Sequence, residues 1–580
     1  MTARRIATAL AFLAGGVLLA LLPALRLPAF YETFLYLVFF WVALATSWNL
    51  ISGYAGYFSF GHAAFFGSGV YTTATLTSKY AVPFLATLPL AGLVAALLGA
   101  GIGLVVFRVR GVRGELFALL TLAITFVLAT IVLNTPIDGG PGVFLAAVPV
   151  PQWLGSSHAT LYLLSLIVAL GSVAAAFAVQ RSRWGTGLFA IRDDEDVGEV
   201  LGVPTYRYKV LAFAVSCFIA GAVGGIYALF VTYVTVTDVF SIGLAVDAIM
   251  MAALGGTRSW FGPAIGAAIV SGLTQTLTGG QSAILNRALI GAVLIAVIVF
   301  LPDGVAGGLA RWRRRPSSSV ASIAVTTASV SARQRPAVGM PLLQCTDVRK
   351  AFRGLQALAG ATLEARAGEI LGLIGPNGSG KSTLINVISG YYRADAGRIT
   401  FDGREITNVE GHRIAGLGLS RTYQIPRSCR RLTVIDNVAL SAMFGAPALG
   451  RDAARSEARR WLGFTGLEAK AEALPAELNL HERKFLDLAR ALAAEPRLIL
   501  MDEVLSGLTP AQMVGALALV RRIREQGTTV IFVEHIMSAV INLADRVVVL
   551  AGGQVLAEGT PRDVMRDPAV IRAYLGRAYA

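Results

Sequence analysis

The sequence has few cysteines and few charged residues. Of its 580 residues only three are cysteine, Cys217, Cys345 and Cys429, and they lie far apart without the spacing of a metal site. This pattern excludes a disulfide-stapled fold and predicts packing thiols in a reducing compartment. Charged residues make up 15% of the chain, hydrophobic residues 55%, and the mean hydropathy is +0.65. Such a chain is too apolar for a soluble protein of this size and too long for one domain.

The shortage of charge is confined to the first half. Residues 1–300 hold 14 of the 50 Lys and Arg and 10 of the 35 Asp and Glu, so a membrane half precedes a more ordinary globular half. The net charge of +15 could indicate a nucleic-acid partner. Much of the excess, however, forms short arginine clusters beside apolar runs, where basic loops mark the cytoplasmic side of a membrane. We therefore expect a lipid bilayer and no nucleic acid as partner.

Runs of about 20 apolar residues predict about ten membrane spans, some of them broken. Basic clusters at 108–113, 181–209 and 311–315 fall on one side if even numbers of spans separate them, which places both ends in the cytoplasm. Glycine-rich stretches at 53–69 and 254–266 are candidates for broken or re-entrant helices, and eight or nine spans is the alternative. The candidate spans are 6–25, 33–51, 60–78, 84–107, 115–134, 160–180, 208–232, 243–256, 261–278 and 284–301.

Composition also indicates the domain limits. Residues 1–312 form the all-α membrane domain, and its first run lacks a clear A-x-A site, which favours an uncleaved helix over a signal peptide. Residues 313–340 form a flexible cytoplasmic linker, because 316–340 are rich in Ser, Thr and Ala without helical periodicity. In residues 341–580 short apolar strands alternate with helical patterns, which predicts an α/β domain with a largely parallel sheet.

A phosphate-binding loop lies near the start of the second half. The stretch EILGLIGPNGSGKSTLINVISG contains G-x-x-x-x-G-K-[ST] between a predicted strand and a predicted helix. The glycines let backbone N–H groups face a β-phosphate, Lys381 adds a positive charge, and the Ser382 hydroxyl can ligate Mg²⁺. The predicted nucleotide-binding residues are Gly375, Pro376, Asn377, Gly378, Ser379, Gly380, Lys381, Ser382 and Thr383.

Two carboxylates follow a later buried strand, LILMDE. Asp502 is placed to hold Mg²⁺ through its water shell, and Glu503 can polarise an attacking water. Gln424, in LSRTYQIP, has an amide that could reach metal and water, and His535, in VIFVEHIM, could contact a γ-phosphate. Phe352 has two open interpretations, a ring stacked on adenine or a core residue.

This order of motifs resembles the nucleotide-binding domain of ABC transporters, over about residues 341–580. SRTYQIPRSCRRLTVIDNV and the tail from VEHIMSAVINLADRVVVLAGGQVLAEGTPRDVMRDPAVIRAYLG are similar to ATP-binding subunits of the branched-chain (hydrophobic) amino acid uptake family. The membrane half resembles a permease subunit of that family through NLISGYAGYFSFGHAAFFGSGVY, RGVRGELFALLTLA, DGGPGV, RWGTGLFAIRDDEDVGEVLGVPTYRYKVLAF and ALGGTRSWFGPAIGA. The expected fold is thus an all-α polytopic membrane domain followed by an α/β P-loop ABC ATPase domain.

The resemblance implies a fused permease and ATPase that imports branched-chain or related hydrophobic amino acids across the bacterial cytoplasmic membrane, with ATP and Mg²⁺. Relatives carry urea, amides and aromatic acids, so these substrates stay open. The implied partners are a second permease subunit, a second ATP-binding subunit and an extracytoplasmic substrate-binding protein. An exporter and a membrane sensor with ATPase but no transport are the other hypotheses. The short cytoplasmic loops argue against an exporter.

Three features of the membrane half bear on transport. The stretch 183–207 is mixed in charge and lies between two spans on the cytoplasmic side, so beside a fused ATPase it is the expected coupling loop. Asp247 lies near the start of a span, where an ionisable group is costly, so a transport role and an interfacial or helix-capping role are both open. Asn49 is a second candidate for the pathway, with packing as the alternative, and His62 is expected to be a packing residue.

The segment LNLHE departs from the family pattern. In the family, this position reads like L-S-x-G-Q and reaches across a dimer to the γ-phosphate held by the partner. Here Leu478 falls on the Leu, Asn479 on the Ser, Leu480 on the variable position, His481 on the Gly and Glu482 on the Gln. Because His481 brings a Cβ and a ring where a Gly permits close approach, the resemblance implies a lopsided pair of ATP sites. A tolerated variant with two equivalent sites is the alternative.

Overall fold

The structure is a computed structural model, and it describes residues 12, 14–25, 28–109, 111–138, 140–277, 291–292, 295, 299–301, 303–313 and 338–575. The chain forms two compact units. The first comprises Met1–Leu188 with Tyr206–Ser317, and the second comprises Phe189–Thr205 with Ser318–Ala580. The short internal stretch 189–205 therefore folds with the C-terminal half, although its neighbours in sequence are helices of the first unit.

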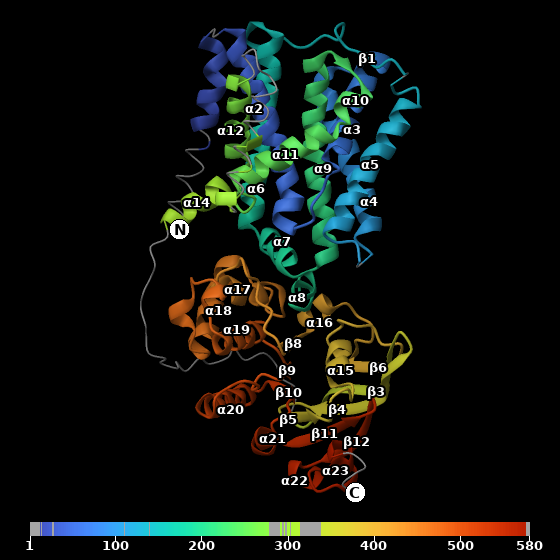
Figure 1. The fold of residues 1–580 in the computed structure, drawn as a ribbon, viewed down its shortest axis with the longest axis vertical. Coiled ribbons are helices and arrows are strands. Elements are labelled where there is room, and N and C mark those ends of the chain that lie inside the picture. Colours follow the sequence, from blue (N-terminus) through green and yellow to red (C-terminus); the bar gives the residue numbers. More distant parts are fainter. Residues whose placement is uncertain are drawn as a thin grey trace. The chain divides into compact units, whose positions relative to one another are not determined.

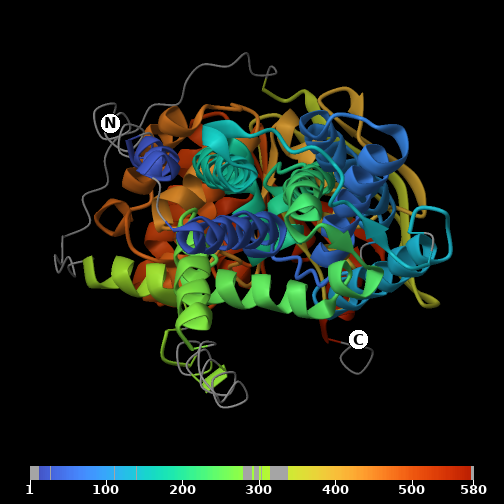
Figure 2. The ribbon, with the colours of Figure 1, turned by 90° about the horizontal axis from the view of Figure 1, so that it is seen from above.

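The first unit is a bundle of apolar helices (Figures 1 and 2). Within it α2 packs on α6, α11 and α12, whereas α3 packs on α4 and α5. Figure 2 views α6 and α9 nearly end-on. Its elements are η1 (Leu22–Leu25), α2 (Ala29–Trp48), η2 (Asn49–Gly53), α3 (His62–Tyr80), α4 (Phe84–Val106), α5 (Glu115–Leu133), β1 (Val143–Phe144), η3 (Trp153–Gly155), α6 (Ser157–Arg181), α7 (Arg183–Asp193, which reaches into the second unit), α9 (Thr205–Val231), β2 (Tyr233–Val234), α10 (Val236–Val239), α11 (Ile242–Gly255), α12 (Gly262–Leu277) and α14 (Gly304–Arg313).

Among the described residues, six helices are long and apolar enough to cross a membrane: Ala29–Gly53, Phe84–Val106, Glu115–Leu133, Ser157–Arg181, Thr205–Val231 and Val236–Gly255. They coincide with six of the ten predicted spans, so the described residues support about six spans. Two other predictions are helices that fall short, since α3 is less apolar and α12 has only 16 residues. The predicted spans 6–25 and 284–301 lie largely outside the described residues.

Both glycine-rich stretches interrupt helices, as expected. After α2 the backbone runs through the π-helical segment η2 and is irregular up to Gly61. Between α11 and α12 the chain approaches itself so closely that a Cβ on Gly255 would lie 1.7 Å from the carbonyl oxygen of Gly262. Only glycine permits that approach, which explains why this stretch is glycine-rich.

The second unit is an α/β domain with a largely parallel sheet, as predicted. Its six-stranded sheet has the order β12-β11-β5-β10-β9-β8, in which only the edge strand β12 runs antiparallel to its neighbour, and a second, antiparallel sheet has the order β4-β3-β6-β7. The strands are β3 (Pro341–Phe352), β4 (Leu355–Arg366), β5 (Ile370–Ile374), β6 (Ala396–Phe401), β7 (Arg404–Glu405), β8 (Leu419–Arg421), β9 (Leu498–Asp502), β10 (Thr529–Val533), β11 (Arg546–Ala551) and β12 (Gln554–Gly559).

Helices cover these sheets, and α17, α18 and α19 pack on one another as a helical group. Strands β5, β9 and β10 are buried at every position, which explains their unbroken apolar sequences. The helices of this unit are α8 (Glu195–Val200), α15 (Lys381–Ile388), α16 (Gly411–Leu417), α17 (Val434–Phe444), α18 (Arg451–Phe464), η4 (Glu468–Lys470), η5 (Pro475–Glu477), α19 (Leu480–Ala493), α20 (Pro510–Glu525), α21 (Met537–Leu543), α22 (Pro561–Val564) and α23 (Pro568–Leu575).

Two further sequence predictions concern the cysteines and the linker. All three cysteines are free and buried, as expected of packing thiols. Burial raises the pKa of the Cys345 and Cys429 thiols to about 12, so both stay protonated near neutral pH. The predicted linker 313–340 lies almost wholly outside the described residues, and its limits stay a prediction.

Candidate functional site

The phosphate-binding loop connects β5 to α15 and takes its shape from glycine. Gly375 has φ +150°, and a Cβ there would lie 2.1 Å from the carbonyl oxygen of Leu550. Gly380 has φ +103°, and its Cβ would lie 2.5 Å from the carbonyl oxygen of Ala357. Any side chain at either position would collide with backbone that cannot move cheaply. The loop therefore leads straight into the N-terminus of α15, where backbone N–H groups face an anion.

Lys381 is held inside this loop. Its ammonium donates to the carbonyl oxygens of Gly375 at 2.8 Å and Pro376 at 2.9 Å, and to the Ser379 hydroxyl at 3.3 Å. Burial lowers the pKa of Lys381, and attraction by Glu503 and Asp502 opposes that shift. The ammonium group is thus held at the loop, where the oxygens of a bound phosphate could replace these carbonyl and hydroxyl partners.

Two predicted residues converge on the carboxylate of a third. Glu503 accepts a hydrogen bond from Gln424 Nε2 at 2.7 Å through one oxygen and lies 3.0 Å from His535 Nε2 through the other. Their strands, β8, β9 and β10, are parallel neighbours, so the residues that follow them emerge at one edge of the sheet. The backbone of Glu503 has φ +48°, a strained conformation for a non-glycine residue of the kind found at functional sites.

Asp502 lies beside this cluster in a buried position. Its side chain is 5% exposed, and its Oδ1 atom has no hydrogen-bond partner among the described residues. Burial raises the pKa of Asp502, and Arg421 offsets part of the shift. The Ser382 residue at the start of α15 is exposed. An orphaned carboxylate oxygen and an accessible hydroxyl are ligands of the kind that Mg²⁺ prefers, so the residues fit the predicted metal.

Two further residues support this site, and the sequence reasoning missed both. Lys484 on α19 donates to the carbonyl oxygens of Glu503 at 3.1 Å and Val504 at 3.2 Å. Glu534 accepts from the backbone N–H of Leu505 at 2.8 Å, and burial raises the pKa of Glu534 to about 7. The sequence could have indicated both. Lys484 lies on the buried side of an amphipathic helix and Glu534 follows an apolar strand, and buried charged residues are rare unless they are paired.

The LNLHE segment forms the start of α19. Asn479 caps the helix, since its Oδ1 accepts from the backbone N–H of Glu482 at 2.9 Å while Glu482 accepts from the Asn479 N–H at 3.0 Å. This is a capping box, in which both side chains are engaged by the helix itself. The His481 ring lies 4.3 Å from the Phe485 ring, and burial lowers its pKa. Leu478 is buried and Leu480 is exposed.

Phe352 lies at the end of β3 in an exposed position, which disfavours the core interpretation. Its ring meets the Tyr392 ring edge-on at 5.0 Å, and the Lys350 ammonium lies 5.4 Å from its centroid. Adenine stacking on this ring stays a prediction.

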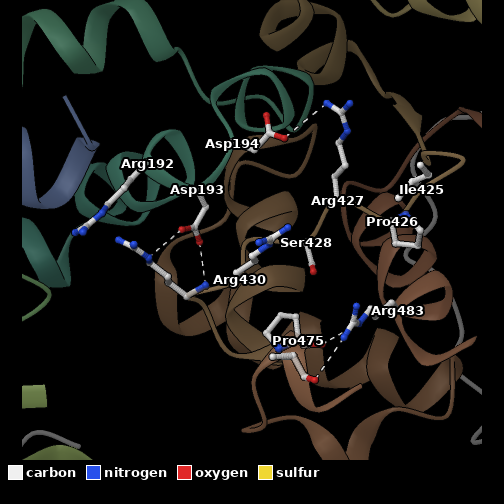
Figure 3. Close-up of a pocket in the computed structure, with 12 residues that line it drawn as sticks. Arg192, Asp193, Asp194, Ile425, Pro426, Arg427, Ser428, Arg430, Pro475 and Arg483 are labelled. Carbon is white, nitrogen blue, oxygen red and sulfur yellow. Dashed lines mark hydrogen bonds and ion pairs between the residues drawn. The ribbon is translucent and has the colours of Figure 1, made fainter. Parts of the chain in front are cut away.

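The expected coupling loop is helical, because α7 and α8 fill most of 183–207. Asp194 caps α8, and its carboxylate lies 3.7 Å from the Arg427 guanidinium. Asp193 accepts from the backbone N–H of Arg431 at 2.9 Å, and its other oxygen lies 3.6 Å from the Arg431 side chain (Figure 3). Further along, a Cβ on Gly202 would lie 2.2 Å from the carbonyl oxygen of Phe444, which marks tight backbone packing. The segment 189–205 thus docks on the same unit as the phosphate-binding loop.

The membrane half places its candidates on different elements. Asn49 begins η2, is buried, and neither polar atom of its side chain has a hydrogen-bond partner among the described residues. Asp247 lies inside α11, whose cap is Ser241, so the capping interpretation of Asp247 is wrong. The His62 Nε2 lies 2.8 Å from the Ser216 hydroxyl, which agrees with the packing role expected for it.

The second unit has a glycine-rich phosphate-binding loop, and Gln424, Glu503 and His535 follow three neighbouring strands. These features define it as an ATP-binding cassette. Residues 358–506 match the ABC transporter family, and residues 554–580 match the family described as branched-chain amino acid ATP-binding cassette transporter. Residues 30–298 match the branched-chain amino acid transport system permease component.

Curated relatives agree with these matches. The chain is 34% identical to a probable branched-chain amino acid transport ATP-binding protein of Archaeoglobus fulgidus, over 41% of this chain and 96% of the relative. It is also 34% identical to a high-affinity branched-chain amino acid transport ATP-binding protein of Pseudomonas aeruginosa, over 41% and 99%. A solved nucleotide-free ATP-binding cassette from an ABC transporter aligns over 41% of this chain and 100% of its own, at 31% identity and a TM-score of 0.38.

The chain belongs to the branched-chain amino acid ABC transporter family and joins the permease domain to the ATP-hydrolysing cassette. It is a membrane protein with a cytoplasmic ATPase domain that binds nucleotide, and the family implies further transporter subunits and a substrate-binding protein.

Proposed function

We propose that this chain imports branched-chain or related hydrophobic amino acids across the bacterial cytoplasmic membrane. It acts with a second permease, a second ATPase and an extracytoplasmic binding protein. The observation that carries the proposal is the convergence of Gln424 and His535 on Glu503 in a chain whose other half matches a branched-chain amino acid permease. Its relatives in Archaeoglobus fulgidus and Pseudomonas aeruginosa, both described as branched-chain amino acid transport ATP-binding proteins, support the substrate class.

The residues of the cassette divide the work of hydrolysis. The loop from Gly375 to Gly380 and Lys381 bind the phosphates, and Glu503 accepts a proton from the attacking water. Gln424 and His535 orient Glu503 from opposite sides and reach toward the γ-phosphate. Mg²⁺, which Ser382, Asp502 and Gln424 would hold, supplies neutralisation of charge that develops on the phosphate oxygens.

Coupling to transport follows from the position of Gln424 in the chain. Arg427 and Arg431, which contact Asp194 and Asp193 on the coupling segment, follow Gln424 within seven residues of the chain. A shift of Gln424 on nucleotide binding would therefore be passed along the loop that carries Arg427 and Arg431. We infer that closure of two cassettes moves the segment 189–205 and turns the permease toward the binding protein, and that hydrolysis resets it.

We further propose that the two ATP sites of the complex are unequal. The capping box commits Asn479 Oδ1 and Glu482 to the helix, so of the two side chains only the Asn479 amide N–H groups could donate to a partner's phosphate. His481 adds a ring at the position where the family has glycine. The site closed by this chain's own loop stays competent, and the partner's site, which LNLHE serves, is the weak one.

The import proposal is tested by uptake into proteoliposomes of the complete complex with its binding protein and ATP. Radiolabelled leucine, isoleucine and valine should enter, and Glu503→Gln should abolish entry. Urea, short-chain amides and phenylalanine are the competing substrates in parallel assays. Uptake of one of these without leucine, isoleucine or valine would contradict the substrate assignment, and ATP hydrolysis without any uptake would favour the sensor hypothesis.

The unequal sites are tested by comparing Glu503→Gln with the matching change in the partner ATPase. If only Glu503→Gln abolishes ATP turnover, the lopsided pair stands. If both changes are equally severe, LNLHE is a tolerated variant and the sites are equivalent.

A further inference from the structure

A basic pocket lies next to the coupling segment, within the second unit. Its volume is about 830 Å³, which is in the range of small-molecule sites. Two aspartates, Asp193 and Asp194, line one side (Figure 3). The arginines that line it are Arg192, Arg427, Arg430, Arg431 and Arg483. Among these lining residues, arginines outnumber the aspartates, so the lining is formally basic.

The arginines differ in how their charge is matched. Arg427 and Arg431 face Asp194 and Asp193, as described above. Arg483 donates to two neutral groups among the described residues, the carbonyl oxygens of Pro475 at 3.1 Å and Ala476 at 3.4 Å.

For Arg430, the structure gives no acidic partner among the residues it describes. Positive charges that lie close together repel one another. A polyvalent anion bound in the pocket would relieve this repulsion, so the pocket attracts such anions.

We propose that this pocket binds a small anion carrying phosphate groups, and that the bound anion loosens the coupling segment. Guanidinium groups bind phosphate through paired N–H donors, and two arginines without an acidic partner in the described part of the chain, Arg430 and Arg483, beside two paired ones favour a multiply charged ligand over a single carboxylate. An anion in the pocket competes with Asp193 and Asp194 for Arg431 and Arg427. It thereby weakens two ion pairs that link 189–205 to the cassette.

The pocket also bears on hydrolysis through the chain. Ile425, Pro426 and Arg427 line it, and they directly follow Gln424, which donates to Glu503. An anion that shifts Arg427 therefore acts on the positioning of Gln424 as well as on coupling. The ligand is a regulator that lowers transport per ATP hydrolysed, and this role is separate from the choice of transported substrate.

The experiment measures pyrophosphate binding to the complete complex by calorimetry. This chain carries Lys381→Ala, so that its nucleotide loop contributes no binding, and the partner's contribution is constant in every comparison. Arg430→Gln should weaken pyrophosphate binding at one site by about tenfold, and adding Arg483→Lys, which keeps the charge but removes the fork, should weaken it further. The matched control is Arg459→Gln on α18, an exposed arginine outside the pocket that should leave binding unchanged.

Hydrogen exchange of residues 189–205 gives the second readout. Pyrophosphate should speed this exchange in the Lys381→Ala complex and not after Arg430→Gln. Inorganic phosphate and AMP, run in parallel, separate a free phosphate from a phosphorylated metabolite as the natural source. No pyrophosphate site beyond the partner's, an equal loss in Arg459→Gln, or binding without faster exchange would each overturn the proposal. An acidic segment of a partner subunit that fills the pocket would give the first of these results.

Discussion

The contact between Asp193 and Arg431 allows a graded test of coupling. The Asp193 carboxylate is 7% exposed, and it accepts from the Arg431 backbone N–H at 2.9 Å. Its approach to the Arg431 side chain is longer, 3.6 Å, and that side chain is 37% exposed. The two interactions therefore differ in strength; a substitution of Arg431 removes the ion pair alone, whereas loss of the Asp193 carboxylate removes both.

The magnitudes follow from this geometry. A buried hydrogen bond to a charged acceptor is worth about 1.5–3 kcal/mol, whereas a partly exposed ion pair is worth about 0.2–1 kcal/mol. Asp193→Ala removes both, so the docking of 189–205 should weaken by roughly 2–4 kcal/mol. Arg431→Gln keeps the backbone N–H and should cost less than about 1 kcal/mol. Asp193→Asn keeps an acceptor without charge and should fall between the two.

The assay is the amount of substrate imported per ATP hydrolysed by the reconstituted complex. We expect the order wild type, Arg431→Gln, Asp193→Asn, Asp193→Ala, with the last reduced by about tenfold or more while ATP hydrolysis persists. Ala471→Ser, a small change outside this contact, serves as a control for handling and folding. If Arg431→Gln is as severe as Asp193→Ala, or if no variant changes the ratio, the backbone hydrogen bond does not carry the coupling and the reasoning is refuted.

The remaining predictions concern the ATP site and its supports. Because burial raises the pKa of Glu534 to about 7 from a model-compound value of 4.5, the folded state holds this proton to higher pH than the unfolded chain does. Its contribution to stability is therefore fully present below about pH 4.5 and declines by about 3 kcal/mol as pH rises through about 7. Thermal unfolding of the full chain across this range should show the decline, and Glu534→Gln should lessen it; an unchanged slope would contradict the assignment. Asn479→Ala should cost about 1 kcal/mol of stability in chemical denaturation, because it removes the cap of α19, whereas Asn479→Asp should be tolerated. When this chain carries Glu503→Gln, only the partner's ATP site remains to hydrolyse ATP. In that complex His481→Gly should raise ATP turnover, and no rise would favour equivalent sites. Gly375→Ala should abolish nucleotide binding, measured with a fluorescent ATP analogue, because its Cβ would meet backbone 2.1 Å away, and retained affinity would refute the steric argument.

Much of the ATP site was predictable because its chemistry is carried by short contiguous motifs. The glycine pattern before Lys381 requires a strand, a tight turn and a helix start, and the structure has β5, the loop and α15 in that order. LILMDE and VIFVEHIM are strands whose apolar runs admit only burial, so the polar residues that follow had to emerge at a sheet edge. Local backbone rules and the hydrophobic effect suffice for such statements.

The number of spans is a quantity that composition alone leaves open. Hydropathy treats every apolar run as a span, but α3 is a buried helix with a more polar sequence and α12 is too short. Whether an apolar helix faces lipid or other helices depends on packing, and packing is not visible in a single run of residues. The capping interpretation of Asp247 failed for a related reason, since the helix start is decided by the loop before Ser241.

By itself, the sequence determined that a membrane half precedes a P-loop cassette, and which residues could bind phosphate, metal and water. Only the tertiary structure brought Gln424 and His535 onto the two oxygens of Glu503, folded 189–205 with the cassette, and gathered arginines from separate segments around one pocket. The physical reason is one of range. Strand, turn and helix preferences act between neighbours in the chain, whereas charge pairing and pocket formation act between residues that meet only after the sheet has ordered its strands.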